Sequence, residues 1–423
     1  MRAIAFLLLF TWLFTASGTI LENGQARLNP YPGQAEIITL DKKTWRNYKP
    51  SAKEISYKGR WDDKHISWWS APGFKLAFTG AKLALSFGQY TSQGVLVAYR
   101  LGGQDWQFSN VTANATYQFI GPTTTGLNLA NAGDAKSFEL RVTNWAYGYV
   151  SPLPGVSVAA DATISRIDEY PKMVEIIGDS LSSGDFATYE GLSSWAPIRV
   201  SASTTRIAGE TPVVRPTNGT APLTRPGGHT RSTATNPPKW NFAAQRPADL
   251  VVINIGTNDN NPANNVSSTD YYNDYITLVG NIHKIWPKAD IVLMSLWGGF
   301  GASGDTYVQG PLWVDEIKRV YQHYEKQGFI HYFDTAGILQ HNDIAPQWHP
   351  TDVGHLKIAA HLMQWVKLKF GWEFGATGPE MLLGYNPLFT VFCRAASRVD
   401  AAAPRIFFIR VSLREKADQR SVA

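Results

Sequence analysis

Ser180 stands at a point in the chain where a serine could act as a nucleophile. The β-branched run Val174–Ile177 leads directly into Gly178–Leu181, which reads Gly-Asp-Ser-Leu, and this pattern predicts a buried strand that ends in a sharp turn. The carboxyl ends of strands carry the chemistry of open α/β sheets. There the hydroxyl of Ser180 would be exposed, and backbone N–H groups of the turn could face a developing negative charge. The alternative is an ordinary helix start capped by Asp179 or Ser180.

Asn258 follows a second strand of the same kind. Residues Val251–Ile255 are apolar except Asn254 and lead into Gly256, and Asn258 is the second residue after that glycine. At the end of a neighbouring strand, its side-chain amide could donate a hydrogen bond to an oxyanion, a contact worth about 3–4 kcal/mol in comparable sites. The alternative is a strand-ending turn in which the asparagine adopts a left-handed backbone conformation.

His349 lies in a third block, Trp348–Asp352, just before the last helical pattern of the chain. Pro350 biases the backbone of His349 toward an extended conformation. An imidazole held in a loop at the edge of a sheet could act as the base for a serine, although a lone histidine is more often structural. His355 and His361 fall inside the predicted helix and are interpreted as packing or surface residues.

Residues 30–165 show the pattern of an all-β domain. Phe74–Phe78 and Leu83–Phe87 alternate strictly and are joined by a short link that contains glycine, which predicts a hairpin. Val95–Leu101 and Trp106–Phe108, separated by a Gly-Gly turn, predict another pair of strands. Short strands with turn signals at this spacing predict a β-sandwich.

After Pro171 the pattern changes to alternating strands and helices, which predicts βαβ units and a parallel sheet. The buried-strand runs are 174–177, 250–255 and 291–296, and the helical patterns between and after them are 275–285 and 314–324. A last amphipathic helix is predicted over Asp352–Phe370, capped by Thr351 or Asp352.

The first 18 residues have the composition of a secretory signal peptide. Arg2 precedes an apolar run, Ala3–Phe14, and small residues follow at Ala16–Gly18, a pattern too short for a membrane span. No later apolar run approaches the ~20 residues that a spanning helix needs. We therefore expect a secreted, extracellular, soluble protein with no membrane partner. Four Asn-x-Ser/Thr sites are compatible with a secreted glycoprotein: Asn110, Asn114, Asn218 and Asn265.

The composition also limits which cofactors and partners can be expected. The single cysteine, Cys393, excludes an intramolecular disulfide. No Cys/His cluster has the spacing of a zinc site, and we expect neither a metal nor another cofactor. The formal net charge is +5, but the basic excess falls in residues 197–236 and 379–423. Because no folded domain carries a basic face, we expect no nucleic-acid partner.

The two basic segments fit neither the all-β pattern nor the alternating pattern of strands and helices. Residues 197–236 are rich in Thr, Ser, Pro and Arg and predict a disordered loop that is unusually long for the inside of a compact domain. Residues 379–423 predict an unstructured tail. Our hypothesis is that both are translated from a wrong reading frame or an unspliced intron, which sequencing of the transcript would test.

In their order and residues, the three blocks resemble the SGNH (GDSL-type) hydrolase superfamily over about residues 171–372. The segments Arg60–Trp69 and Phe74–Phe87 are similar to the amino-terminal sandwich of one branch of it, the two-domain acetyl esterases of carbohydrate esterase family 2. The chain looks most like a fungal-like secreted form of these enzymes. The resemblance implies a jelly-roll-like sandwich followed by a three-layer, flavodoxin-like α/β domain.

The resemblance also implies roles for three residues. Ser180 matches the nucleophile, and its own backbone N–H would be one oxyanion donor. Asn258 matches the side-chain oxyanion donor, and His349 matches the general base. The implied reaction is acyl transfer: Ser180 attacks an ester carbonyl, His349 takes the proton, and water then releases acetate from the acyl-enzyme.

The sequence departs from the superfamily's pattern in two places. Pro346 stands where most members have an Asp, three residues before the histidine. In this esterase family a main-chain carbonyl can orient the base instead, so the carbonyl of Gln347 is the first candidate and Asp343 the second. The glycine block, another oxyanion donor, should fall in the first basic segment, where neither Gly209 nor Gly227–Gly228 lies in a recognisable strand-turn context.

The implied function is a secreted serine esterase that removes acetyl groups from plant cell-wall polysaccharides or oligosaccharides, acting as a monomer. Trp297 and Trp348 stand near the expected active-site edge, where flat rings suit sugars, although both could equally be core residues. Two alternatives stay open. One is a carbohydrate-binding protein with a catalytically impaired hydrolase domain, and the other is a lipase-like esterase on longer acyl chains.

Overall fold

The computed structural model describes residues 34–374 except 63, 68–69, 103, 125–126, 128–132, 144–151, 169, 199–202, 210–241, 245 and 346–347, together with strands β1 (Leu21–Glu22) and β2 (Gln25–Ala26). All described elements belong to one compact unit, Met1–Pro379. The predicted signal peptide, the tail 379–423 and most of 197–236 lie outside the described residues. Among the described residues, no helix combines the length and apolarity needed to cross a membrane.

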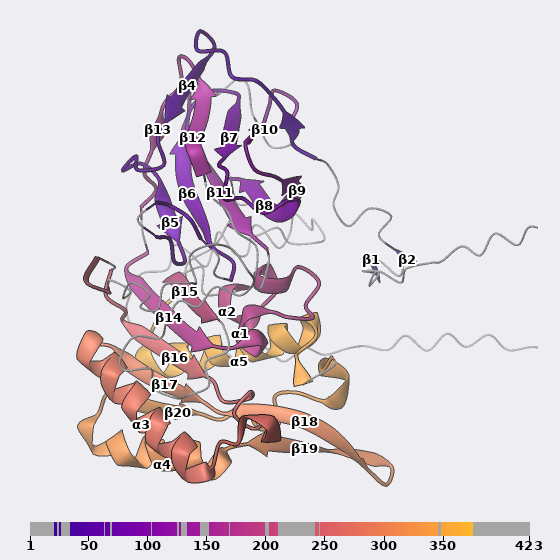
Figure 1. Cartoon of the computed structure of the whole chain (residues 1–423), viewed down its shortest axis with the longest axis vertical. Helices are drawn as coiled ribbons and strands as arrows, with labels where there is room; N and C mark the ends of the chain where they lie inside the picture. Colours follow the sequence, from indigo (N-terminus) through magenta and orange to yellow (C-terminus); the bar gives the residue numbers. More distant parts are fainter. Residues whose placement is uncertain are drawn as a thin grey trace, which may run out of the picture. The chain divides into compact units, whose positions relative to one another are not determined.

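The N-terminal part consists of two antiparallel sheets that face each other (Figure 1). The first has the order β3 (Glu36–Ile37), β10 (Ala115–Ile120), β7 (Leu83–Phe87), β12 (Pro152–Ala159), β4 (Trp45–Tyr48). The second has the order β13 (Ile164–Ser165), β6 (Gly73–Phe78), β11 (Lys136–Val142), β8 (Val95–Leu101), β9 (Gln107–Val111), and β5 (Ser56–Lys58) pairs with β6. The predicted β-sandwich is therefore present.

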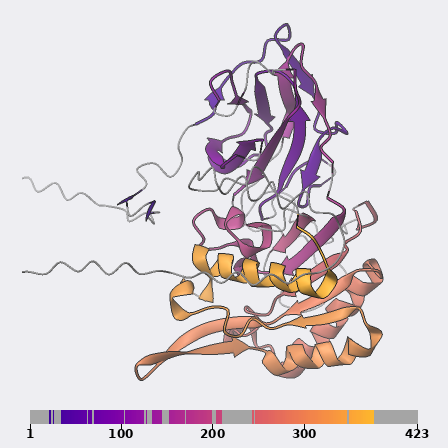
Figure 2. The ribbon, with the colours of Figure 1, turned by 180° about the vertical axis from the view of Figure 1, so that it is seen from behind.

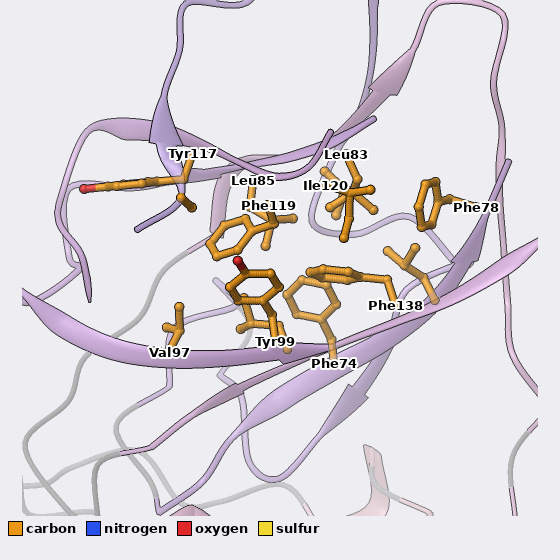
Figure 3. Packing of buried hydrophobic residues seen from close by; sticks show 14 of the residues in the cluster. Phe74, Phe78, Leu83, Leu85, Val97, Tyr99, Tyr117, Phe119, Ile120 and Phe138 are labelled. Atoms are coloured by element: carbon orange, nitrogen blue, oxygen red, sulfur yellow. The ribbon is translucent and has the colours of Figure 1, made fainter. Parts of the chain in front are cut away.

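Aromatic side chains fill the space between these two sheets. Figure 3 shows Phe74, Tyr99 and Phe138 from the second sheet reaching toward Phe119 and Leu85 from the first. The rings of Tyr99 and Phe119 meet edge to face, with centroids 4.8 Å apart, a favoured geometry for aromatic pairs. Alternate residues of each strand point inward, and this alternation in the sequence is what places them in the core.

The predicted hairpin between Phe74–Phe78 and Leu83–Phe87 is wrong. Strand β6 pairs with β5, β11 and β13, whereas β7 pairs with β10 and β12 in the other sheet. The link through Gly80, which has a φ of +85°, therefore carries the chain from one sheet to the other. Alternation alone cannot separate the two cases, because strands in facing sheets bury their apolar faces in the same core. The other predicted pair is confirmed as the antiparallel strands β8 and β9.

The C-terminal part is a parallel sheet of order β15 (Ser203–Gly209), β14 (Lys172–Gly178), β16 (Leu250–Asn254), β17 (Asp290–Met294), β20 (Ile330–Phe333). Helices α3 (Ser268–Ile285) and α4 (Val314–Tyr324) cover one face, and α5 (Asp352–Phe370) covers the other with the short α1 (Ser180–Ser183) and α2 (Trp195–Ile198) (Figures 1 and 2). This confirms the expected three-layer α/β architecture. A hairpin of β18 (Leu296–Ser303) and β19 (Thr306–Leu312) extends away from the sheet (Figure 1).

The predicted helices are confirmed, and two strands of the parallel sheet, β15 and β20, were not predicted. Helix α5 spans the predicted range, and its cap is Thr351, whose side chain accepts a hydrogen bond from the backbone N–H of Gly354. Strand β20 lies at the sheet edge, where its half-buried central residues interrupt the apolar pattern. Strand β15 lies within 197–236, so the expectation that this whole segment is disordered is wrong for Ser203–Gly209.

Three contacts among the described residues join the sandwich to the strand-turn region around Ser180. Arg60 forms an ion pair with Glu175 of β14, and both side chains are buried. The hydroxyl of Ser70 donates to the carbonyl of Ser183 at 3.1 Å, and the ring of Phe108 stacks on that of Tyr189 with centroids 4.2 Å apart. The region around Ser180 is thus held partly by residues more than 70 positions earlier in the chain.

Candidate active site

The turn after β14 presents Ser180 as the first residue of α1. Gly178 ends the strand, and a Cβ at this position would lie 2.0 Å from the Oγ of Ser182, so only glycine fits. Asp179 caps the helix, because its Oδ1 accepts a hydrogen bond from the backbone N–H of Leu181 at 3.0 Å. The helix cap and the serine at the strand end are therefore both present: Asp179 is the cap, and the half-buried Ser180 follows it.

His349 reaches Ser180 from the loop before α5. Its Nε2 lies 2.8 Å from the Oγ of Ser180, a hydrogen-bonding distance between groups 169 residues apart in sequence. The loop is fixed on both sides, since Ala345 N–H donates to the carbonyl of His349 at 2.7 Å and Thr351 N–H donates to the carbonyl of Asp343 at 2.8 Å. This contact is the geometry that a serine nucleophile and its base require.

The two candidates for orienting His349 have different outcomes. Gln347, whose carbonyl was the first candidate, lies outside the described residues. The carboxylate of Asp343, the second candidate, instead accepts hydrogen bonds from Gln340 N–H at 2.8 Å and from Lys357 Nζ at 2.6 Å. Asp343 is thus a structural residue that holds the loop to α5, and the choice of Gln347 stays a prediction.

A carboxylate that the sequence analysis did not single out lies beside the Ser180–His349 contact. Asp185 Oδ2 is 3.6 Å from His349 Nε2. The next residue, Phe186, is 45% exposed, and its ring centroid is 5.0 Å from that of His349. The sequence signal was the second Gly-Asp pair: Gly184 has a φ of +88° and turns the chain back toward the serine at the end of α1.

Asn258 is placed by the strand next to β14. Gly178 and Asn254 are register partners in the parallel pair of β14 and β16, so the two strands end side by side. Asn258 lies four residues beyond and is half-buried. Its backbone carbonyl accepts from Asn264 Nδ2 at 2.7 Å, whereas no hydrogen bond among the described residues uses its side-chain amide. That amide is available to a ligand at the strand ends.

Gly209 occupies the position that the sequence analysis could not recognise. It ends strand β15, where it is the register partner of Gly178 on the other side of β14. Threonine and arginine dominate this edge strand, so the segment lacked the apolar signal of a buried strand. Three polar or backbone groups are therefore brought to one edge of the sheet, at Ser180, Asn258 and Gly209.

Asp179 is a buried carboxyl group beneath the serine. Burial raises its pKa to about 6, the nearby charge of Asp259 adds to the rise, and the hydrogen bond from Leu181 N–H opposes it. Its Oδ2 is buried without a hydrogen-bond partner among the described residues. The folded protein therefore holds this proton more tightly than the unfolded chain does, where an aspartate titrates near pH 3.9.

This pKa predicts a pH-dependent stability. Between about pH 4 and pH 6 the folded state binds more protons at Asp179 than the unfolded state, so its contribution to stability falls as pH rises through this window. Asp179→Asn keeps an acceptor for the helix cap and removes the charge. We expect it to stabilise the protein at pH 7.5 by up to about 3 kcal/mol and to have no effect of this origin at pH 4. Urea unfolding of both proteins at both pH values measures this difference in stability. A difference that does not change with pH would contradict the role of the Asp179 proton.

The two tryptophans near the site have opposite environments. Trp297 is fully buried, and its Nε1 donates to the carbonyl of Trp348 at 3.0 Å, so of the two interpretations the core residue is the correct one. Trp348 is 38% exposed and has a φ of +66°. Its indole lies against Gly299, where a Cβ would be 2.2 Å from the Trp348 Nε1. The glycine and the buried tryptophan thus hold Trp348 beside His349.

His355 confirms its interpretation as a packing residue. It is fully buried, and its Nδ1 accepts a hydrogen bond from Trp195 N–H at 3.2 Å. Burial and, as a smaller cause, the proximity of His349 together lower the pKa of its imidazole to about 3. His355 is therefore neutral at physiological pH and joins α2 to α5, whereas His361 is exposed.

A serine and a histidine in contact at the carboxyl edge of a three-layer parallel sheet, with strand-end donors beside them, define a serine-hydrolase class of protein. Residues 176–357 match the model of the GDSL-like lipase/acylhydrolase family. This match lies in the α/β domain, and the chain is a carboxylic ester hydrolase. No curated protein matches the chain.

Solved structures share the fold over both parts of the chain. A family two carbohydrate esterase from Clostridium thermocellum, in complex with cellohexaose, is 19% identical with a TM-score of 0.58, covering 75% of this chain and 100% of that one. The Cellvibrio japonicus family two enzyme is 16% identical with a TM-score of 0.58, covering 78% and 98%. The family two enzyme of Corynascus thermopiles (Myceliophthora fergusii) is 18% identical with a TM-score of 0.53, covering 75% and 100%. These likenesses establish the shared fold.

Proposed function

We propose that this protein is a secreted esterase that removes acetyl groups from plant cell-wall polysaccharides or oligosaccharides through a Ser180 acyl-enzyme. The observation that carries the proposal is the 2.8 Å contact between Ser180 Oγ and His349 Nε2. It also favours an active enzyme over a binding protein with an impaired hydrolase domain, because it is the contact that a serine nucleophile and its base require.

The proposed reaction proceeds in two acyl transfers. Ser180 Oγ attacks the ester carbonyl while His349 Nε2 accepts its proton, and His349 then gives that proton to the departing sugar oxygen. Water attacks the acetyl-Ser180 ester with His349 again as base, which releases acetate and restores the serine.

The oxyanion of each tetrahedral intermediate needs hydrogen-bond donors. The backbone N–H of Ser180, the backbone N–H of Gly209 and the side-chain amide of Asn258 are the candidates, since all three stand at the same edge of the sheet. The assignment of Gly209 follows from its place beside Gly178 and supplies the glycine donor that the family resemblance implies.

Separate observations support a carbohydrate substrate and secretion. Trp348 offers a partly exposed indole next to the catalytic histidine, and flat aromatic faces suit sugar rings. The clostridial esterase of the same fold binds cellohexaose. Secretion rests on the composition of residues 1–18, and three of the four glycosylation sites, Asn110, Asn114 and Asn265, are exposed; Asn218 lies outside the described residues.

The substrate class is tested at Trp348. Wild type is expected to release acetate from acetylated xylo-oligosaccharides, and Trp348→Ala to raise KM for them by about three- to tenfold through the lost stacking surface. The rise in KM should be smaller for p-nitrophenyl acetate, because this ester is too small to stack on the indole. Trp348→Phe is the matched control, because it keeps an aromatic face.

Two outcomes would contradict the carbohydrate assignment. One is a wild-type enzyme that hydrolyses p-nitrophenyl acetate but releases no acetate from any acetylated oligosaccharide. The other is a preference for p-nitrophenyl esters of long acyl chains over the acetate, which would favour the lipase-like alternative.

A further inference from the structure

Asp185 has no structural task that the described residues reveal. Its side chain is 27% exposed, and its Oδ2 lies 3.6 Å from His349 Nε2. No hydrogen bond to the carboxylate comes from another described residue, and no lysine or arginine in the described part of the chain forms an ion pair with it. A carboxylate of this kind is solvated unless a ligand replaces the water.

Asp185 lies on the side of the His349 imidazole that faces Ser180. A third member that orients a base contacts the nitrogen away from the serine. Asp185 instead approaches Nε2, the nitrogen that faces Ser180 Oγ. The carboxylate therefore lies on the side of the site where the ester must bind, next to the atoms that react.

The backbone holds Asp185 in this place. Gly184 has a φ of +88°, and a Cβ there would lie 2.2 Å from the carbonyl oxygen of Glu190, so the turn admits only glycine. The backbone N–H of Asp185 donates to the carbonyl of Ser180 at 3.2 Å. The carboxylate is thus tied to the same short helix that presents the nucleophile.

We propose that Asp185 is a specificity-determining residue that selects against anionic esters. This inference rests on the proposed esterase function. A fixed negative charge at the entrance to Ser180 repels a substrate that carries a carboxylate close to its ester, while a neutral acetylated sugar meets no such penalty. The substrate class that fits the site is therefore the neutral acetyl ester.

The test compares two acetyl esters of similar size, the neutral p-nitrophenyl acetate and the anionic 4-acetoxybenzoate, at low ionic strength. Wild type should prefer the neutral ester, and Asp185→Asn should reduce the ratio of the two kcat/KM values by about tenfold, the size expected for one partly solvated charge. The reduction should shrink in 1 M salt because the interaction is screened. The ratio also cancels any general effect of the substitution on His349.

Asp305→Asn is the matched control. Asp305 lies between β18 and β19 and is exposed, so its substitution changes the net charge equally without touching the site and should leave the ratio unaltered. A ratio in Asp185→Asn equal to that of wild type, or one that Asp305→Asn lowers as much, overturns the inference. The proposed function fails separately, if wild type hydrolyses neither ester or if Ser180→Ala hydrolyses both as fast as wild type.

Discussion

Ser180→Ala is expected to lower kcat/KM for p-nitrophenyl acetate by about 10⁴-fold or more, because the covalent intermediate can no longer form. The methyl group of alanine fits where the Oγ stood, since that oxygen only meets His349 at 2.8 Å. The fold should therefore be kept. Initial rates, together with an unchanged unfolding midpoint, measure the effect.

Three further variants sharpen this expectation. His349→Ala should cost about as much as Ser180→Ala, and the double variant little more than either, because residues that act as one unit lose their effect together. Ser303→Ala, at an exposed serine of the β18–β19 hairpin, should retain wild-type activity. A Ser180→Ala protein within tenfold of wild type would show that another residue performs the reaction.

Arg60→Ala is expected to destabilise the protein by about 3–5 kcal/mol, the usual result of removing one partner from a buried ion pair. Arg60 and Glu175 are both buried, and Glu175 is only 1% exposed, in the strand that leads to Ser180. Without the guanidinium, the carboxylate loses an oppositely charged neighbour in a site that water reaches poorly. The free energy of unfolding, measured in urea, gives the loss.

The chain offers a matched control for this prediction on the same strand. Lys172 and Asp249 form a pair at 3.2 Å, but their side chains are 46% and 32% exposed. Lys172→Ala should therefore cost less than about 1 kcal/mol. The double variant Arg60→Met with Glu175→Leu should recover most of the stability, because it removes both charges. An Arg60→Ala loss no larger than that of Lys172→Ala would contradict the role of burial.

Elements with a strong local pattern could be predicted from the sequence. The range Asp352–Phe370 has a long helical repeat, a threonine cap and a following glycine, and the structure reproduces it. Ser180 and Asn258 could be located because each follows a buried apolar strand, and parallel strands end at the same edge. His349 could be located because it stands just before the capped helix.

What could not be predicted depends on contacts between distant residues. The pairing of β6 and β7 with different sheets leaves no trace in their own alternation. Gly209 ends an edge strand whose polar residues hide it. Asp185 lies beside His349 only because a left-handed glycine turns the chain there, and the burial of Trp297 follows from the hairpin that begins at Leu296.

The separation of Ser180 and His349 has a kinetic consequence. Their contact joins the first central strand of the sheet to the loop before the last helix, 169 residues later. Contacts of such long range form late, because the intervening chain must be ordered before its ends can meet. The return of hydrolysis during refolding would therefore report completion of the whole α/β domain, while the sandwich and the local helices could already be formed without any activity.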